Sequence, residues 1–115
     1  MSTRIYHNPR CSKSRQTLAL LREHGIEPEI IEYLRTPQSA EELQALLNLP
    51  GLEAKQLVRV KEAAWREAKQ DLAAMSDAEI VSALVDIPSL LERPVVVHNG
   101  RTCIGRPPEN VLDLL

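Results

Sequence analysis

The stretch that decides the fold lies near the C-terminus and runs PVVVHNGRTCI, residues 94–104. A run of three valines is typical of a buried strand. The pair Asn99-Gly100 is the strongest two-residue signal for a β-hairpin, because both turn positions need a positive φ. Residues 101–104 then form the returning strand, so the stretch is predicted to be a hairpin of two antiparallel strands.

The N-terminal third of the chain predicts a different unit, made of a strand, a helix and a second strand. The strands are residues 3–7 and 29–33, each with apolar or aromatic side chains at its centre. Residues 13–24 carry leucines at helical spacing, and Gly25 ends the helix. Such a unit brings its two strands together in parallel with a right-handed crossover.

The middle of the chain is predicted to be helical. Ser39 and Ser76 each stand three residues before a glutamate, which is the pattern of a capping box at a helix start. Residues 54–74 supply one or two further helices, and residues 109–115 a terminal helix. Approximately residues 38–88 are therefore interpreted as a helical insert within a single domain of residues 1–115.

The order of these elements favours an α/β fold of the thioredoxin or glutaredoxin type with a mixed sheet. Without the insert, the chain runs strand, helix, strand, hairpin and helix, which is the thioredoxin order. A flavodoxin-like sheet would also begin with alternating strands and helices. It would, however, use a crossover connection where the Asn99-Gly100 turn occurs.

The composition limits the classes of function. The chain has 115 residues, 43% of them hydrophobic, with a net charge of -2, which fits one domain without a strong field for nucleic acid. Its aromatic residues, Tyr6, Tyr33 and Trp65, are too few for a platform on which bases stack. No apolar run suits a membrane span or a signal peptide. We expect a cytoplasmic monomer that binds neither nucleic acid nor membrane, with both cysteines reduced.

The candidate reactive group is Cys11, between the first predicted strand and the first helix. Unpaired N–H groups and the dipole at a helix start stabilise a thiolate, so the pKa of Cys11 should fall below the free value of about 8.5. Arg10, Lys13 and Arg15 add positive charge nearby. The same donors suit a tetrahedral oxyanion. The alternative is a buried and inert cysteine.

A second thiol is missing where a dithiol protein would have one. The run Cys11-Ser12-Lys13-Ser14 has the spacing of a C-x-x-C redox motif in which Ser14 replaces the second cysteine. A serine cannot form a disulfide, so an external thiol must complete any turnover. Cys103 is interpreted as a small side chain that fills a strand. A zinc site on His7 and Cys11 would need nearly all the cysteines and histidines of the chain, and we expect no metal.

The segment YHNPRCSKSR, residues 6–15, resembles the active-site segment of ArsC-type arsenate reductases, the kind that depends on glutathione and glutaredoxin. The resemblance continues through EYL at residues 32–34, LVR at 57–59, RPVVV at 93–97 and GRPPE at 105–109. It therefore covers essentially the whole chain.

This resemblance implies a mechanism. Cys11 attacks arsenate, which Arg59, Arg93 and Arg106 hold, as guanidinium forks suit a tetrahedral anion. Water leaves and a Cys–S–As(V) adduct forms. Glutathione, as a co-substrate, then reduces As(V) to As(III), and glutaredoxin or glutathione clears the mixed species so that arsenite departs. No tightly bound cofactor is implied.

Supporting roles are expected for His7, Ser14, Arg15 and Pro94. His7 could be a base, a hydrogen-bond partner of the thiolate or only a strand-end residue. Because a thiolate that has already formed needs no base, we favour a local electrostatic or structural role. Pro94 is expected to face Cys11, and both the element order and the resemblance imply a cis bond before it.

Other functions stay open. Better-characterised members of the family extend further at the C-terminus, which leaves the substrate less defined than the fold. One alternative is a glutathione-dependent thiol reductase of another substrate. Another is an Spx-like regulator that binds RNA polymerase, although such regulators typically carry a C-x-x-C switch. Each arginine could also be a solvated surface residue, Arg59 above all, because it lies in a charged segment predicted to be helical.

Overall fold

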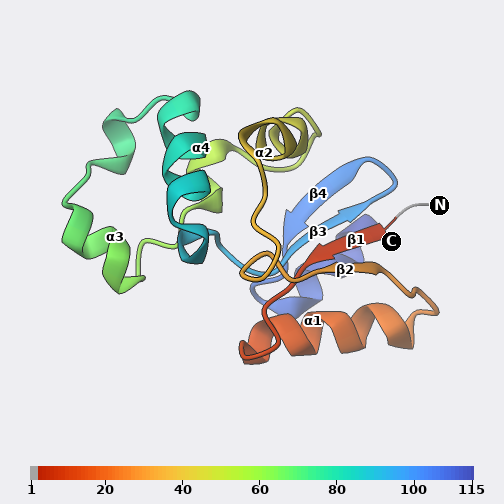
Figure 1. Ribbon diagram of the computed structural model, residues 1–115. Coiled ribbons are helices and arrows are strands. Elements are labelled where there is room, and N and C mark those ends of the chain that lie inside the picture. The colour runs from red at the N-terminus through yellow and green to blue at the C-terminus, as the bar shows by residue number, and fades with distance from the viewer. Residues whose placement is uncertain (1–2) are drawn as a thin grey trace.

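The computed structural model describes residues 3–115. At its centre is a four-stranded sheet with the strand order β2-β1-β3-β4 (Figure 1). The strands are β1 (Thr3–Tyr6), β2 (Glu29–Ile31), β3 (Val95–His98) and β4 (Arg101–Ile104). Strands β1 and β2 run parallel, whereas β3 is antiparallel to both β1 and β4. The sheet is therefore mixed, as predicted.

The predicted hairpin is present as β3 and β4. Asn99 and Gly100 form its turn with φ angles of 51° and 79°, the positive values that this pair adopts readily. Every residue of β3 is buried. Successive side chains of a strand point to opposite faces, so the consecutive valines indicate that both faces of the sheet are covered.

One face of the sheet is covered by α1 (Ser12–Glu23) and the C-terminal segment η4 (Pro108–Leu114). Figure 1 shows α1 running beneath the sheet. The buried apolar side chains of this layer are Ile5, Leu18, Leu21, Val96, Val111 and Leu114. The predicted terminal helix of residues 109–115 is a 3₁₀ helix, η4, and not an α-helix.

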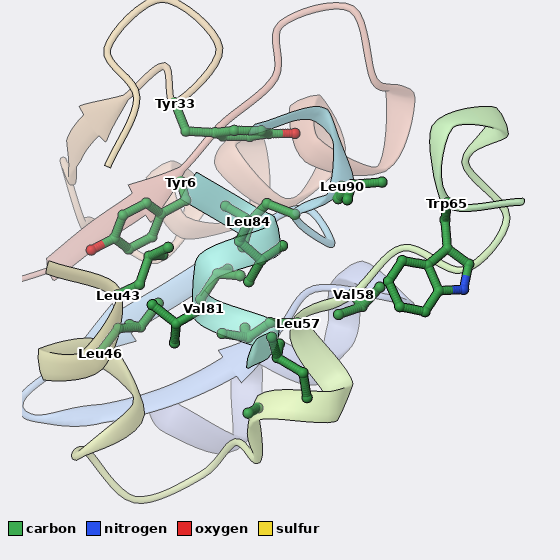
Figure 2. Packing of buried hydrophobic residues seen from close by; sticks show 14 of the residues in the cluster. Tyr6, Tyr33, Leu43, Leu46, Leu57, Val58, Trp65, Val81, Leu84 and Leu90 are labelled. Atoms are coloured by element: carbon green, nitrogen blue, oxygen red, sulfur yellow. The ribbon is translucent and has the colours of Figure 1, made fainter. Parts of the chain in front are cut away.

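The opposite face carries the elements between β2 and β3. They are α2 (Ala40–Leu47), η1 (Ala54–Leu57), α3 (Ala63–Ala68), η2 (Leu72–Ala74), α4 (Asp77–Asp86) and η3 (Pro88–Leu90). Their buried side chains form the larger of the two apolar clusters, part of which is drawn in Figure 2. The sheet contributes Tyr6 and Val95 to this cluster. Both predicted capping boxes are complete, at Ser39 and Ser76.

Residues 54–74 differ from the prediction of one or two helices. They form three short helical segments, η1, α3 and η2, separated by turns and short extended stretches. Lys69 ends α3 in a left-handed conformation, with a φ of 52°. Leu57 and Trp65 are both buried, and a break between their elements lets each reach the cluster separately.

The topology is that of a thioredoxin-like fold. The unit β1-α1-β2 is the predicted parallel βαβ unit, and the antiparallel pairing of β3 with β1 rules out the doubly wound alternative. The first two strands end earlier than predicted, at Tyr6 and Ile31. His7 and Tyr33 therefore lie just beyond the edge of the sheet at which α1 begins.

Candidate active site

Cys11 is the N-cap residue of α1. Its backbone is extended, with φ −92° and ψ 122°, and its carbonyl accepts the first helical hydrogen bond from the N–H of Arg15 at 3.0 Å. Asn8 shapes the preceding loop. Its carbonyl accepts from the N–H of Cys11 and its Oδ1 from the N–H of Arg10, both at 3.0 Å. The thiol is thereby held, half-exposed, at the start of a helix.

The surroundings of Cys11 favour the thiolate. Burial raises the pKa of the thiol, but hydrogen bonds from the Ser14 N–H, the Arg93 side chain and the Lys13 N–H, with the charge of Arg93, bring the pKa below its ordinary value. A helix start supplies such unpaired N–H groups. The direction of this shift agrees with the prediction for Cys11.

The positive charge at the thiol comes from the far end of the chain. Arg106 Nη1 lies 4.0 Å from Cys11 Sγ and 3.5 Å from the carbonyl oxygen of Arg93. Of the neighbours expected to supply that charge, Arg15 instead donates from Nη1 to the carbonyl of Pro9 at 2.9 Å. The side chain of Arg15 therefore fixes the loop before the thiol by binding the backbone of Pro9.

Arg93 and Arg106 each stand before a proline, and both peptide bonds are cis. The cis bond at Pro94 confirms the prediction, whereas the one at Pro107 was not foreseen. The N–H of Gly105 donates to the carbonyl of Pro94 at 2.9 Å, which ties the two segments together. The two arginines consequently meet beside α1, although they are distant in the sequence.

Arg59 lies in an extended segment, not in the helix that was expected. Val58 forms an isolated antiparallel bridge with Leu91. On either side of the bridge, the Arg59 N–H donates to the Leu90 carbonyl at 2.7 Å, and the Glu92 N–H to the carbonyl of residue 57 at 2.6 Å. This pairing sets the backbone of Arg59 alongside the segment that leads to the hairpin.

Two glutamates that the sequence analysis did not single out lie among the arginines. Glu62 Oε2 is 3.9 Å from Arg59 Nε and 4.0 Å from Arg93 Nη1, and Glu92 Oε1 is 3.5 Å from Arg106 Nε. Glu62 follows Arg59 by three residues, and that spacing could have indicated a pair. These separations exceed normal hydrogen-bond lengths, so the carboxylates leave donors unpaired.

Two guanidinium N–H groups of the site are buried without a partner among the residues that the structure describes. They are Arg59 Nη1 and Arg93 Nε. A buried donor with no acceptor is costly, and its partner is commonly a ligand or ion. Arg93 acts on the Cys11 thiolate, and Glu62 lies between Arg93 and Arg59. This arrangement of donors is chemically suited to a tetrahedral oxyanion.

His7 and Ser14 form a buried pair behind the thiol. His7 Nδ1 lies 2.6 Å from Ser14 Oγ, and the same oxygen accepts from the Asn8 N–H at 3.1 Å. Burial lowers the pKa of His7, which outweighs the opposing effect of Glu32 and keeps the imidazole neutral at pH 7. The contact agrees with a structural role, because it fixes the loop whose turn presents Cys11.

A cleft of about 600 Å³ opens beside the site, lined by residues of four segments that include Arg10, Glu32, Arg35, Glu62 and Arg93. Its walls carry both signs of charge. A volume in this range is large enough for a small peptide or metabolite.

Cys103 has a different setting. It packs against the apolar cluster between α1 and the sheet, and burial, with a smaller effect of Asp113, raises its pKa to about 11. It therefore stays protonated at neutral pH. Both cysteines are free thiols.

Two kinds of feature are absent from residues 3–115. No group of three or more histidine, cysteine, aspartate or glutamate side chains gathers there in a way that could hold a metal ion. No helix in that range has the length and apolar character needed to cross a membrane.

Comparison with known proteins places these residues in context. The model of the ArsC family matches residues 6–114. Uncharacterized protein YfgD of Escherichia coli K12 is 50% identical over 113 residues, 97% of this chain and 95% of that protein. A Neisseria meningitidis protein named arsenate reductase is 44% identical, over 94% of this chain and 93% of that one. The structure of an arsenate reductase from Vibrio cholerae has 47% identity and a TM-score of 0.91, covering 100% of this chain and 98% of the other.

Proposed function

The chain belongs to the ArsC family, and from the geometry of its site we propose that it is an arsenate reductase with Cys11 as the nucleophile. The observation that carries the proposal is the approach of guanidinium groups to a thiolate, with Arg106 Nη1 4.0 Å from Cys11 Sγ and Arg93 acting on the same sulfur. Arginines neutralise an oxyanion that would otherwise repel the thiolate. Relatives named arsenate reductase, at 43–44% identity, support the choice of oxyanion.

The first step forms a bond between sulfur and arsenic. The Cys11 thiolate attacks arsenate while Arg59, Arg93 and Arg106 hold the oxygens that stay. One arsenate hydroxyl group takes up a proton from solvent and leaves as water. Arsenic is still As(V) in this adduct, so no electrons have yet been transferred.

The second step reduces arsenic with the help of an external thiol. The glutathione thiolate attacks the Cys11 sulfur and forms a mixed disulfide. The S–As bond breaks with its electron pair on arsenic, which leaves as arsenite, As(III). Glutaredoxin or a second glutathione then reduces the mixed disulfide and restores Cys11. Because this cycle consumes reduced glutathione, we place it in the cytoplasm.

The charged cleft beside the site is the proposed position of glutathione. Glutathione carries carboxylates and an ammonium group, and the walls of the cleft offer Arg10 and Arg35 together with Glu32 and Glu62. Ser14 cannot replace the external thiol because it forms no disulfide. Cys103 is a poor substitute, since its pKa of about 11 leaves it protonated.

The test is a turnover assay of the purified chain with arsenate, glutathione and glutaredoxin. We expect arsenite and glutathione disulfide to form in equal amounts, and the reaction to stop after one adduct per chain when glutathione is omitted. A chain that reduces a glutathione mixed disulfide but yields no arsenite would instead be a thiol reductase of another substrate. A chain active with neither substrate would contradict an enzymatic role.

A further inference from the structure

Tyr33 carries a buried polar group that the proposed mechanism leaves unused. Tyr33 is 1% exposed, and among residues 3–115 no acceptor lies in hydrogen-bonding geometry to its hydroxyl group. A buried tyrosine hydroxyl normally finds a partner. The absence of one here needs an explanation, because an unpaired hydroxyl is costly to bury.

The surroundings of this hydroxyl belong to the active site. Arg93 acts on it most strongly, through its charge and through a side-chain N–H directed at the hydroxyl oxygen, and Cys11 and Glu92 act on it through their charges. Tyr33 follows β2, and so lies at the same edge of the sheet as the loop that carries Cys11. Figure 2 shows the rings of Tyr6 and Tyr33 pointing their hydroxyl groups in opposite directions.

The Tyr33 hydroxyl shares its lack of a partner with two other donors of the site. Arg59 Nη1 and Arg93 Nε are also buried without an acceptor. The Glu62 carboxylate lies near both arginines, but it faces other nitrogens of theirs. Its Oε2 is 3.9 Å from Arg59 Nε and 4.0 Å from Arg93 Nη1. Three unpaired donors in one site are best explained by a bound acceptor with several oxygens.

We propose that the Tyr33 hydroxyl donates a hydrogen bond to the bound tetrahedral oxyanion, as a neutral fourth donor beside Arg59, Arg93 and Arg106. This inference rests on the proposed function for the identity of the oxyanion, arsenate. It assigns Tyr33 to binding, and no proton is transferred. Burial raises the pKa of Tyr33 to about 12, so the hydroxyl keeps its proton and stays a donor at neutral pH.

The test compares the two buried tyrosines of the same apolar cluster. Tyr33→Phe and Tyr6→Phe each remove one hydroxyl, but the ionisable groups around Tyr6 are Arg4, Glu42 and Glu29, away from the thiol. Arsenate binding is measured by calorimetry in chains that also carry Cys11→Ser, which cannot form the adduct. We expect Tyr33→Phe to weaken binding about tenfold, the effect of losing a hydrogen bond to a charged group, and Tyr6→Phe to leave it within about twofold.

Thermal unfolding separates a ligand donor from a structural hydroxyl. Because the Tyr33 hydroxyl proton has no acceptor among residues 3–115, Tyr33→Phe should not lower the unfolding midpoint. Equal arsenate affinity in both variants, or a lowered midpoint for Tyr33→Phe, would overturn the inference. Binding that depends on Tyr33 in a chain that does not reduce arsenate would sustain it while refuting the proposed function. No arsenate binding at all would refute both.

Discussion

Cys11 and Cys103 are the same chemical group in two regions of one small fold, and the regions give them opposite properties. Cys11 caps α1, where backbone N–H groups and Arg93 lower its pKa. Cys103 lies on β4 against the apolar layer between α1 and the sheet, where burial raises its pKa to about 11. Burial raises the pKa of both thiols, and the donors around Cys11 reverse that effect, whereas Cys103 has no such donors among residues 3–115 to lower its pKa. The comparison teaches that a partly buried thiol becomes reactive only where donors surround the sulfur.

The largest effect is expected when each cysteine is replaced in turn. Cys11→Ser should abolish arsenate turnover, because no other thiolate lies beside the arginines. Cys103→Ser should keep most activity, since a thiol with a pKa of about 11 is protonated at neutral pH and an external thiol completes the cycle. Arsenite release with glutathione and glutaredoxin measures both. Loss of turnover in a folded Cys103→Ser chain would show that Cys103 is an internal resolving thiol, and the comparison would then fail.

Much of the fold behind this comparison could be predicted because its signals are local. The hairpin followed from Asn99-Gly100, and the helix start at Cys11 from the loop before it. The broken helices of residues 54–74 could not be predicted, because tertiary contacts of Leu57 and Trp65 override a favourable helical composition. Helix propensity is a weak guide where buried contacts compete with it.

The candidate site likewise has a part that could be predicted from local sequence and a part that could not. The position of Cys11 was visible from its neighbours in the sequence, whereas the donors around it come from distant segments. The pairing of Val58 with Leu91 aligns the backbone of Arg59 with the segment before the hairpin, and no local pattern indicates that bridge. The sequence placed Tyr33 at the end of a predicted strand and in a segment that resembles the family, but it gave the hydroxyl no role, because whether that group has a partner depends on packing.

The second largest effect is expected when the arginines beside Cys11 are replaced, because Cys103 has no such role in oxyanion binding. Arg93→Ala and Arg106→Ala should each weaken oxyanion binding by about 1.5–3 kcal/mol, roughly tenfold or more, through loss of a charged contact. Arg93→Ala should also raise the pKa of Cys11, because Arg93 stabilises the thiolate. Sulfate or arsenate affinity and the pH dependence of Cys11 alkylation measure these changes.

The matched control for the arginines is Arg22→Ala. Arg22 is exposed, and its Nε pairs with Glu27 Oε2 at 3.0 Å, away from the thiol. This variant also removes a guanidinium from an ion pair, but it should leave oxyanion affinity unchanged. Unaltered affinity in both Arg93→Ala and Arg106→Ala would remove the arginine site. Equal losses in all three variants would indicate a general effect of net charge.

The smallest effect is expected in the alkylation of the two cysteines, which compares their pKa values directly. Alkylation rate followed against pH, with each cysteine identified by mass spectrometry, should rise for Cys11 at an inflection below the ordinary value of 9.0 and for Cys103 near 11. Thiolate is the reactive form, so each rate increases as pH passes the pKa of that thiol.

Asp113→Asn removes the carboxylate that adds to the effect of burial on Cys103. Because burial is the larger cause, the pKa of Cys103 should fall only slightly and stay above its ordinary value of 9.0, while Cys11 alkylation and turnover are unchanged. A Cys103 inflection that drops to that of Cys11 would mean that charge, and not the apolar layer, keeps this thiol unreactive.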